Sequence, residues 1–376
     1  MQAQDTHARR IKQARRTLRN LIRPAYPYDP PANARFETAD YVELAALAMG
    51  RRTSISDASI TMRDRGNTRL PHADTFHEHP HALDEDPRAV LDAFNTALDG
   101  IIDAVRPAGW LPAGPVAIDG HCEPYHGDHH NDWVVGNKGT RGTNWAHKYL
   151  TSQRIQEPKI QLGLEPVTPK RGRSSALASL VLSTMLRMEV TLWLLDREFY
   201  NRMDLRTLMA TGRDFAIPVP RDRRPRQQED AAWRAKSRVG ARYVSIMPHD
   251  AGDADGSIPV FHVYQWRPDE KEPSGWRLFV YATPHKPTLE TADARADEYR
   301  TRWTIETGYR LTEEVRLRTT TTHYPNRLLL SCLALLLDAY WRLVAYAKSL
   351  RDPQADTITS RQLRGWIAHA VMEATA

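Results

Sequence analysis

The chain has 376 residues, enough for two or three domains, and 41% of them are hydrophobic, a fraction typical of globular proteins. It has no uninterrupted run of about 18 apolar residues, and residues 1–20 lack the apolar core of a secretory signal, so neither membrane insertion nor secretion is expected. The net charge of +6 favours a polyanionic partner, and only two cysteines, Cys122 and Cys332, favour a reducing cytoplasm over a disulfide scaffold.

Positive charge is concentrated in two segments. Residues 1–30 hold seven basic residues against two acids, and residues 221–242 hold eight against three. Arg outnumbers Lys 43 to 9, a bias that suits bidentate phosphate contacts and equally suits a GC-rich genome. Separated basic segments on one chain favour an extended polyanion over a small ligand.

Residues 1–110 have helical periodicity. Residues 38–52 carry apolar side chains at helical spacing, and residues 86–107 predict an amphipathic helix with Asp86 as N-cap and Pro87 in its first turn. A helix-turn-helix within residues 40–84 and a plain helical bundle both fit this pattern. We expect residues 1–110 to form an N-terminal helical domain.

Strand-like segments begin near residue 111. The apolar pattern predicts three strands, a helix, a strand, a helix and a strand, at residues 115–124, 132–155, 159–169, 173–190, 191–199, 201–212 and 214–221. This order predicts an α/β fold with a mixed sheet and flanking helices.

Residues 221–285 break that order. Three strand-like segments joined by turn residues predict a β-rich insertion subdomain, and helical periodicity resumes at Ala292. The predicted core therefore occupies residues 111–220 and 286–325. A C-terminal helical segment, 326–376, includes an apolar helix interrupted by Asp338 that we expect to be buried.

Three carboxylates stand out by position. Asp119 and Asp196 each follow an apolar strand, at the sheet edge where ligands bind in open sheets, and Glu306 lies on the helix after the insertion. A lone Asp at a strand end is more often a turn or cap residue. Three carboxylates on separate elements, however, can hold two divalent cations, and oxygen ligands select Mg²⁺ or Mn²⁺.

Residues 298–316 form a highly charged helical segment. Tyr299, Arg302, Trp303, Glu306 and Arg310 recur at steps of three and four, which places them on one face. A solvated helix with Glu–Arg pairs is one interpretation. A cation-binding carboxylate beside phosphate-binding groups is the other, with Trp303 expected to pack in the core.

These residues resemble the DDE transposases of the IS4 type, which belong to bacterial and archaeal insertion sequences. The Tyr-x2-Arg-x3-Glu signature is matched by Tyr299, Arg302 and Glu306, and the segments "AIDG" and "LLDREFYN" match the two aspartate regions. The resemblance covers roughly residues 111–350. Glu313 stands where the family motif has Lys, so a phosphate-binding role is not expected there.

The resemblance implies an RNase H-like core with Asp119, Asp196 and Glu306 as catalytic and metal-binding residues for two Mg²⁺ or Mn²⁺ ions. It implies cleavage of the ends of a mobile element and joining of the 3′-hydroxyl to target DNA, with a hairpin intermediate and a homodimer in the synaptic complex. Residues 1–110 would bind the DNA ends. The expected DNA contacts are Tyr299, Arg302, Arg310, Lys138, Arg141 and Lys148, the last three on glycine-containing strands flanking Asp119.

Two alternatives remain open. His121, His126, His129 and His130 lie close together in the sequence, so a zinc-dependent phosphoesterase is possible, although their spacing fits neither HExxH nor HxHxDH. We expect these histidines not to converge. A domesticated DNA-binding protein without catalysis is the second alternative. For a transposase, the expected location is the cytoplasm, on the nucleoid when bound to DNA, without membrane contact.

Overall fold

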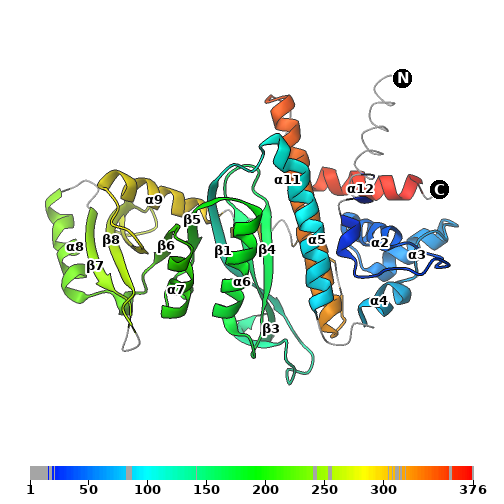
Figure 1. Cartoon of the computed structure of the whole chain (residues 1–376), viewed down its shortest axis with the longest axis horizontal. Helices are drawn as coiled ribbons and strands as arrows, with labels where there is room; N and C mark the ends of the chain where they lie inside the picture. Colours follow the sequence, from blue (N-terminus) through cyan, green and yellow to red (C-terminus); the bar gives the residue numbers. More distant parts are fainter. Residues whose placement is uncertain are drawn as a thin grey trace. The chain divides into compact units, whose positions relative to one another are not determined.

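In the computed structural model, the described residues are 16, 19–20, 22–81, 87–140, 142–239, 244–252, 256–303, 305–306, 308–309, 313, 316–317, 319–354 and 358–374 (Figure 1). The chain forms two compact units. The helical unit comprises residues 1–111, 157–163 and 307–376, and the sheet unit comprises residues 112–156 and 164–306.

The helical unit combines helices from both ends of the chain. Its helices are α2 (Thr38–Arg51), α3 (Ile55–Asp64), α4 (Ala73–His81), α5 (Arg88–Val105), α11 (Tyr324–Arg351) and α12 (Ser360–Ala374). α2 packs against α12, and α5 packs against α11. The segments expected as an N-terminal domain and a C-terminal helical segment thus share one core, because the apolar face of α5 needs α11 to cover it.

The predicted helix at 86–107 is present as α5. Its N-cap is Pro87, and Asp86, the expected cap, lies outside the described residues. α2 is buried along almost its whole length, and Ser54 caps α3 by accepting the backbone N–H of Asp57 at 3.0 Å. The helical expectation for this part of the chain is confirmed, while the choice between a helix-turn-helix and a bundle stays open.

α11 is the longest helix among the described residues. It has the length and composition of a membrane-spanning helix, but 78% of its most apolar window is buried inside the protein. Leu329, Leu333 and Leu336 are all under 3% exposed. The expectation of a buried core helix is confirmed for α11.

The sheet unit is built on one mixed sheet. Within the described residues it contains nine strands: β1 (Gly114–Pro124), β2 (Val135–Thr140), β3 (Thr143–Arg154), β4 (Gln161–Val167), β5 (Val190–Leu195), β6 (Asp214–Pro218), β7 (Val244–Asp250), β8 (Pro259–Pro268) and β9 (Trp276–Thr283). Their order is β2-β3-β1-β5-β6-β9-β8-β7, with β4 pairing β3. β1 is antiparallel to β3 and parallel to β5, and β5 is parallel to β6. The expected α/β fold with a mixed sheet is confirmed.

The expected strand count before the first helix of the sheet is wrong. Residues 132–155 were expected to form one strand, but they form the hairpin β2–β3, so four strands precede α6 (Gly172–Arg187). Gly142 in the connection has φ +82°, a conformation that suits glycine, and this turn reverses the chain.

The three strands of the predicted insertion are present as β7, β8 and β9. They do not stand apart, because β9 pairs with β6 and so continues the core sheet. The arginine-rich segment before them forms a helix, α8 (Arg226–Val239), that the sequence pattern did not predict. α8 lies against β8, where Trp266 donates its indole N–H to the Ala232 carbonyl at 2.9 Å.

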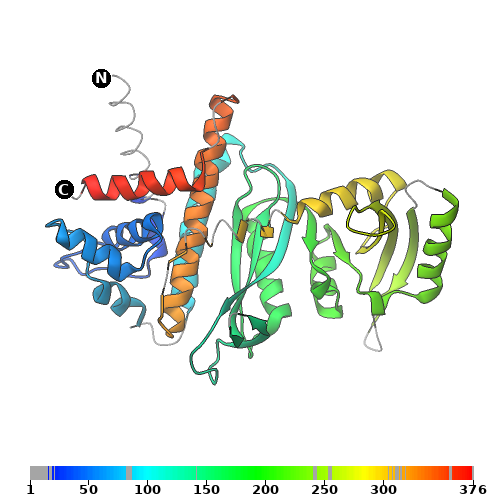
Figure 2. The same cartoon turned by 180° about the vertical axis from the view of Figure 1, so that it is seen from behind.

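Helices flank the sheet (Figure 2). α6 packs on β3 through the buried pair Ser152–Thr184, whose hydroxyl oxygens are 2.7 Å apart. α7 (Arg202–Ala210) packs on α6. α9 (Leu289–Thr301) is attached to β9, because Tyr281 donates its hydroxyl to the Ala292 carbonyl at 3.0 Å. α9 thereby brings the Tyr299–Glu306 segment to the sheet.

The ion pair within α11 gives a prediction for stability. Arg342 Nε donates to Asp338 Oδ2 at 2.7 Å, and Asp338 is 2% exposed, so burial raises its carboxyl pKa while Arg342 opposes the rise. Arg342→Met should lower the free energy of unfolding by about 3 kcal/mol, because it leaves a buried carboxyl without its cation. Asp338→Leu combined with Arg342→Met should recover most of that loss. Urea unfolding of the three proteins measures both effects, and a single-variant loss under about 0.5 kcal/mol would contradict the assignment.

Candidate active site

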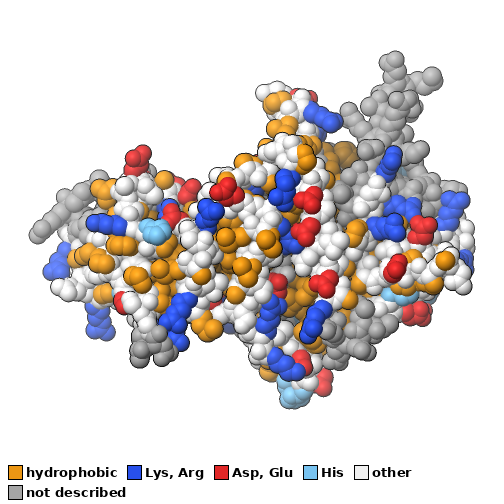
Figure 3. All heavy atoms as spheres, viewed as in Figure 1, with side chains coloured by type: hydrophobic (Ala, Val, Ile, Leu, Met, Phe, Trp, Pro, Cys, Tyr) orange, Lys and Arg blue, Asp and Glu red, His pale blue; other side chains and the backbone are white. Residues whose placement is uncertain are grey.

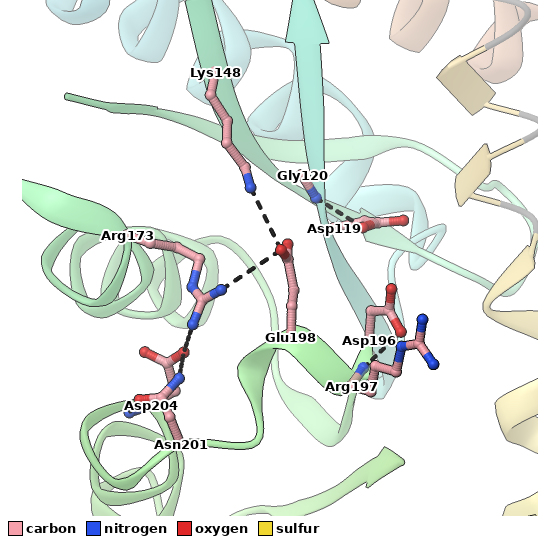
Figure 4. Close-up of polar contacts among 9 residues, drawn as sticks. All are labelled: Asp119, Gly120, Lys148, Arg173, Asp196, Arg197, Glu198, Asn201 and Asp204. Atoms are coloured by element: carbon pink, nitrogen blue, oxygen red, sulfur yellow. Dashed lines mark hydrogen bonds and ion pairs between the residues drawn. The ribbon is translucent and has the colours of Figure 1, made fainter. Parts of the chain in front are cut away.

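The first two acidic residues lie on neighbouring parallel strands. Ile118 and Leu195 form the last pair between β1 and β5, and Asp119 and Asp196 follow them directly. β1 itself continues to Pro124, and Asp119 still pairs with Thr151 of β3, so Asp119 lies within its strand and not at the strand end that was expected. Asp196 caps a short 3₁₀ helix, η3 (Arg197–Phe199), by accepting the backbone N–H of Arg197 at 2.5 Å. Asp119 accepts the backbone N–H of Gly120 at 2.8 Å (Figure 4). Parallel pairing thus brings two acids to one sheet edge although 77 residues separate them in the sequence.

Arg302 joins Asp119 to Glu306. One terminal nitrogen of its guanidinium donates to Asp119 Oδ2 at 3.0 Å, and the other donates to Glu306 Oε1 at 3.3 Å. The side chains of Arg302 and Asp119 are 6% and 15% exposed, whereas that of Glu306 is 38% exposed. The structure therefore brings Asp119, Glu306 and Arg302 together in the sheet unit.

Burial controls the charge of Asp119. Loss of hydration raises the pKa of its carboxyl to about 6, Arg302 and the Gly120 N–H oppose the rise, and the nearby carboxylate of Asp196 adds to it. The effect of Asp196 on Asp119 places the two carboxylates within electrostatic reach of each other. Burial is the largest cause of the raised pKa, and Arg302 offsets part of the rise.

Tyr299 lies beneath this group. Its side chain is 8% exposed, its hydroxyl donates to the Leu195 carbonyl at 3.2 Å, and burial raises its pKa. The Arg302 guanidinium carbon is 5.5 Å from the centre of its ring. Tyr299 was expected to contact DNA, but in this arrangement its phenol fixes the end of β5 and supports Arg302.

Two expectations for the charged segment need correction. α9 ends at Thr301 and Arg302 is its C-cap, so residues 298–316 are not one continuous helix. Trp303 is not a core residue, because 61% of it is exposed. Helical spacing alone does not show which face the rest of the chain covers.

A second charged group adjoins Asp119. Glu198, in η3, accepts a hydrogen bond from Lys148 of β3 at 3.4 Å and forms an ion pair with Arg173 of α6 at 3.5 Å. Arg173 also donates to Asp204 of α7 at 3.2 Å (Figure 4). We call Lys148, Arg173 and Glu198 the Glu198 clamp. Sequence reasoning singled out Lys148 but missed Arg173 and Glu198, although Glu198 stands only two residues after Asp196.

The structure describes only some of the other predicted DNA contacts. Lys138 is exposed on β2. Arg141 and Arg310 lie outside the described residues. Glu313, where the family motif has Lys, accepts a hydrogen bond from Arg316 at 2.7 Å.

The histidines were expected to stay apart, and this is only partly right. Ligand atoms of Asp128, His129 and His130 lie within 4.8 Å of one another, while His121 and His126 are not part of this group. The three residues are consecutive, and Asp128 Oδ1 already accepts the His130 backbone N–H at 3.0 Å, so a tight turn accounts for their closeness. His129 stacks on Trp145 with ring centres 4.4 Å apart. Asp119 does not belong to this group.

Comparison with known proteins supports a transposase fold. No family model matches the chain, and no curated protein matches its sequence. Among solved structures, it is similar to the cryo-EM structure of a piggyBac transposase synaptic complex with hairpin DNA, with a TM-score of 0.60 and 10% sequence identity. The similarity covers 93% of this chain and 74% of that one. The chain therefore shares the fold of that transposase.

The electrostatics of Asp119 give a prediction for the metal-free protein. Its carboxyl should titrate near pH 6, and Asp196→Asn should lower that pKa because one neighbouring negative charge is removed. Carbon-detected NMR of carboxyl-labelled aspartate, with Asp119→Asn to assign the resonance, measures both values. An unchanged pKa in the Asp196→Asn protein would show that the two carboxylates are not neighbours.

Proposed function

We propose that the protein is a DNA transposase that cleaves the ends of its own mobile element and joins the 3′-hydroxyl to target DNA. One observation carries the proposal. Asp119, Asp196 and Glu306 come from three elements separated by 77 and 110 residues, yet they gather around Arg302 on a fold shared with a transposase. Structural ion pairs alone would not need three acids at the edge where parallel strands end.

The strand order supports the finer proposal of an RNase H-like core. β1 is antiparallel to β3, and β5 and β6 continue the sheet in parallel on the other side of β1. A mixed sheet of this kind is compatible with the RNase H-like core that the resemblance implies. The assignment to the IS4 type rests on the Tyr299, Arg302 and Glu306 signature, since no family model matches.

The acidic group fits divalent cations. Its donors are carboxylate oxygens, which suit Mg²⁺ or Mn²⁺. Burial and the nearby carboxylate of Asp196 both raise the pKa of Asp119, and a bound cation would offset that rise. Asp119, Asp196 and Glu306 would hold two such ions. When bound, the ions would activate the attacking water or 3′-hydroxyl and stabilise the leaving oxygen.

Arg302 has a defined part in this proposal. Between Asp119 and Glu306 it supplies the positive charge that cations would otherwise supply. When the carboxylates are occupied, its planar donors are free to bind and orient a phosphate of the DNA strand. Tyr299 would keep the guanidinium beside the group, since the two side chains are stacked.

The proposed partner is double-stranded DNA, as terminal inverted repeats and as target. The similar transposase was determined as a synaptic complex with hairpin DNA. This supports DNA binding here and a hairpin excision route as parts of the proposal. A homodimer in the synaptic complex is also proposed, on the resemblance alone. Lys138, Arg141, Lys148 and Arg310 would contact phosphates, and residues 1–110 would recognise the ends. Its place would be the cytoplasm, on the nucleoid when DNA is bound.

The surface charge is compatible with DNA binding but does not show where DNA would lie on the protein. On the face drawn in Figure 3, the described Lys and Arg side chains are interspersed with Asp and Glu over both units. Phosphate contacts would therefore come from individually placed cations on that face rather than from one basic patch.

A zinc-dependent phosphoesterase is the second candidate, and the Asp128–His129–His130 group is the observation that favours it. That group is separate from the strand-end acids. A nicking assay distinguishes the two: the transposase needs Mg²⁺ or Mn²⁺ and tolerates His129→Asn with His130→Asn, whereas the zinc enzyme needs Zn²⁺ and loses activity in that double variant. DNA binding without cleavage under either condition would favour the non-catalytic alternative.

Replacing the three acids tests the proposed function. Asp119→Asn, Asp196→Asn and Glu306→Gln should each reduce Mg²⁺-dependent strand cleavage at least about 100-fold, because each loses an ion-holding charge while keeping its shape. Binding to DNA should stay within a few-fold of the unmodified protein. The matched controls are Asp132→Asn, on an exposed loop, and Glu290→Gln, near the start of α9. Cleavage at the unmodified rate in any of the three would remove that residue from the site.

A further inference from the structure

The Glu198 clamp lies against the backbone of the residue after Asp119. A Cβ atom at Gly120 would stand 3.0 Å from Lys148 Cε and 3.3 Å from Glu198 Oε1. Because side chains alternate along a strand, the clamp is on the opposite side of β1 from the Asp119 side chain (Figure 4). Glycine at 120 thus leaves room for the Lys148–Glu198 pair beside the backbone of β1.

Arg173 is held in place by contacts other than the one to Glu198. Arg173 donates to Asp204, which is fully buried and also binds the Asn201 side chain. The Arg173 guanidinium carbon lies 5.1 Å from the centre of the Phe199 ring. Lys148 projects from β3, in register with Cys122 of β1. Arg173 therefore does not depend on Glu198 alone for its position.

Glu198 is the most replaceable member of the clamp. Its side chain is 35% exposed, against 21% for Lys148 and 27% for Arg173, and it stands on a three-residue helix. Its ion pairs are 3.4 and 3.5 Å long. Partly exposed pairs of this kind are weak and are readily exchanged for another anion.

The charges around Glu198 would allow its carboxylate to be exchanged for a phosphate. Asp204 balances Arg173, and Glu198 balances Lys148. A phosphodiester carries one negative charge, as does the glutamate carboxylate. Replacing the carboxylate by a phosphate therefore leaves the local charge unchanged, and the planar Arg173 fork suits phosphate oxygens.

We propose that Lys148 and Arg173 form a second phosphate-binding site, and that Glu198 is the internal anion that a phosphate of the DNA strand displaces. The inference rests on the proposed function, because it takes DNA as the partner. It adds Arg173 and Glu198 to the residues that contact or release DNA. Glu198, two residues after Asp196, would thus hold the site until DNA binds and would not itself bind a metal ion.

DNA affinity tests the exchange directly, in the full chain and with a chelator present so that no cleavage occurs. The probe is a short fluorescent duplex of arbitrary sequence, and anisotropy is measured over a series of NaCl concentrations. Glu198→Gln should bind about two- to fivefold more tightly, because the competing carboxylate is gone. Lys148→Gln should bind more weakly, and its slope of log affinity against log salt should be shallower by about 0.9.

The double variant and a matched pair provide the controls. In the Lys148→Gln background, the gain from Glu198→Gln should shrink, because the site that benefits has lost a cation. Asp132→Asn and Lys170→Gln disrupt an exposed carboxylate–lysine pair on the same unit and should show no such coupling. Glu198→Ala serves as a second variant, and thermal melting verifies that each protein is folded.

The inference would be overturned if Glu198→Gln and Glu198→Ala bound DNA no more tightly than the unmodified protein, or if their gain were equal with and without Lys148. Such a result with Mg²⁺-dependent cleavage intact would leave the proposed function standing. Conversely, the predicted coupling in a protein whose cleavage survives replacement of the three acids would support the phosphate site and reject the proposed chemistry.

Discussion

The site depends on one buried guanidinium held between two carboxylates that the sequence keeps far apart. Arg302 donates to Asp119 on β1 and to Glu306 beyond α9, with 183 residues between itself and Asp119. Without this cation, burial of Asp119 beside Asp196 would leave like charges close together in a poorly hydrated place. Arg302 thus allows three acids to sit at one sheet edge before any other cation arrives.

The rest of the sheet unit serves to hold that arrangement. Parallel pairing of β1 and β5 puts Asp119 and Asp196 at the same edge, and Tyr299 ties the start of the Arg302 segment to the end of β5 through the Leu195 carbonyl. β9 pairs with β6, and α9 is bonded to β9. This pairing brings α9 back to the same edge after the β7–β9 segment. The β-rich segment is therefore part of the scaffold that positions Glu306.

The sequence predicted the strands and acids whose signals are local. The "LWLL" run before Asp196 and the "VAI" run before Asp119 are buried strands because parallel strands are covered on both faces. The β2–β3 hairpin was missed because its glycine-containing turn interrupts a segment whose strand pattern is otherwise continuous. Trp303 was misplaced because helical spacing does not reveal which face has a neighbour. The ion pair between Glu198 and Arg173 could not be predicted from the sequence, because it forms only where α6, β3 and η3 come together in space.

We propose that Arg302 occupies, among Asp119, Asp196 and Glu306, the place where cations would bind. A crystal soaked with Mn²⁺ tests it most directly, because anomalous scattering locates that ion without assumptions about its ligands. The account predicts Mn²⁺ bounded by these three carboxylates, as two ions about 4 Å apart when both sites fill, with the Arg302 guanidinium moved away from Asp119. Carboxylates still bound to Arg302 with no Mn²⁺ among them, or Mn²⁺ found only at Asp128, His129 and His130, would contradict the account.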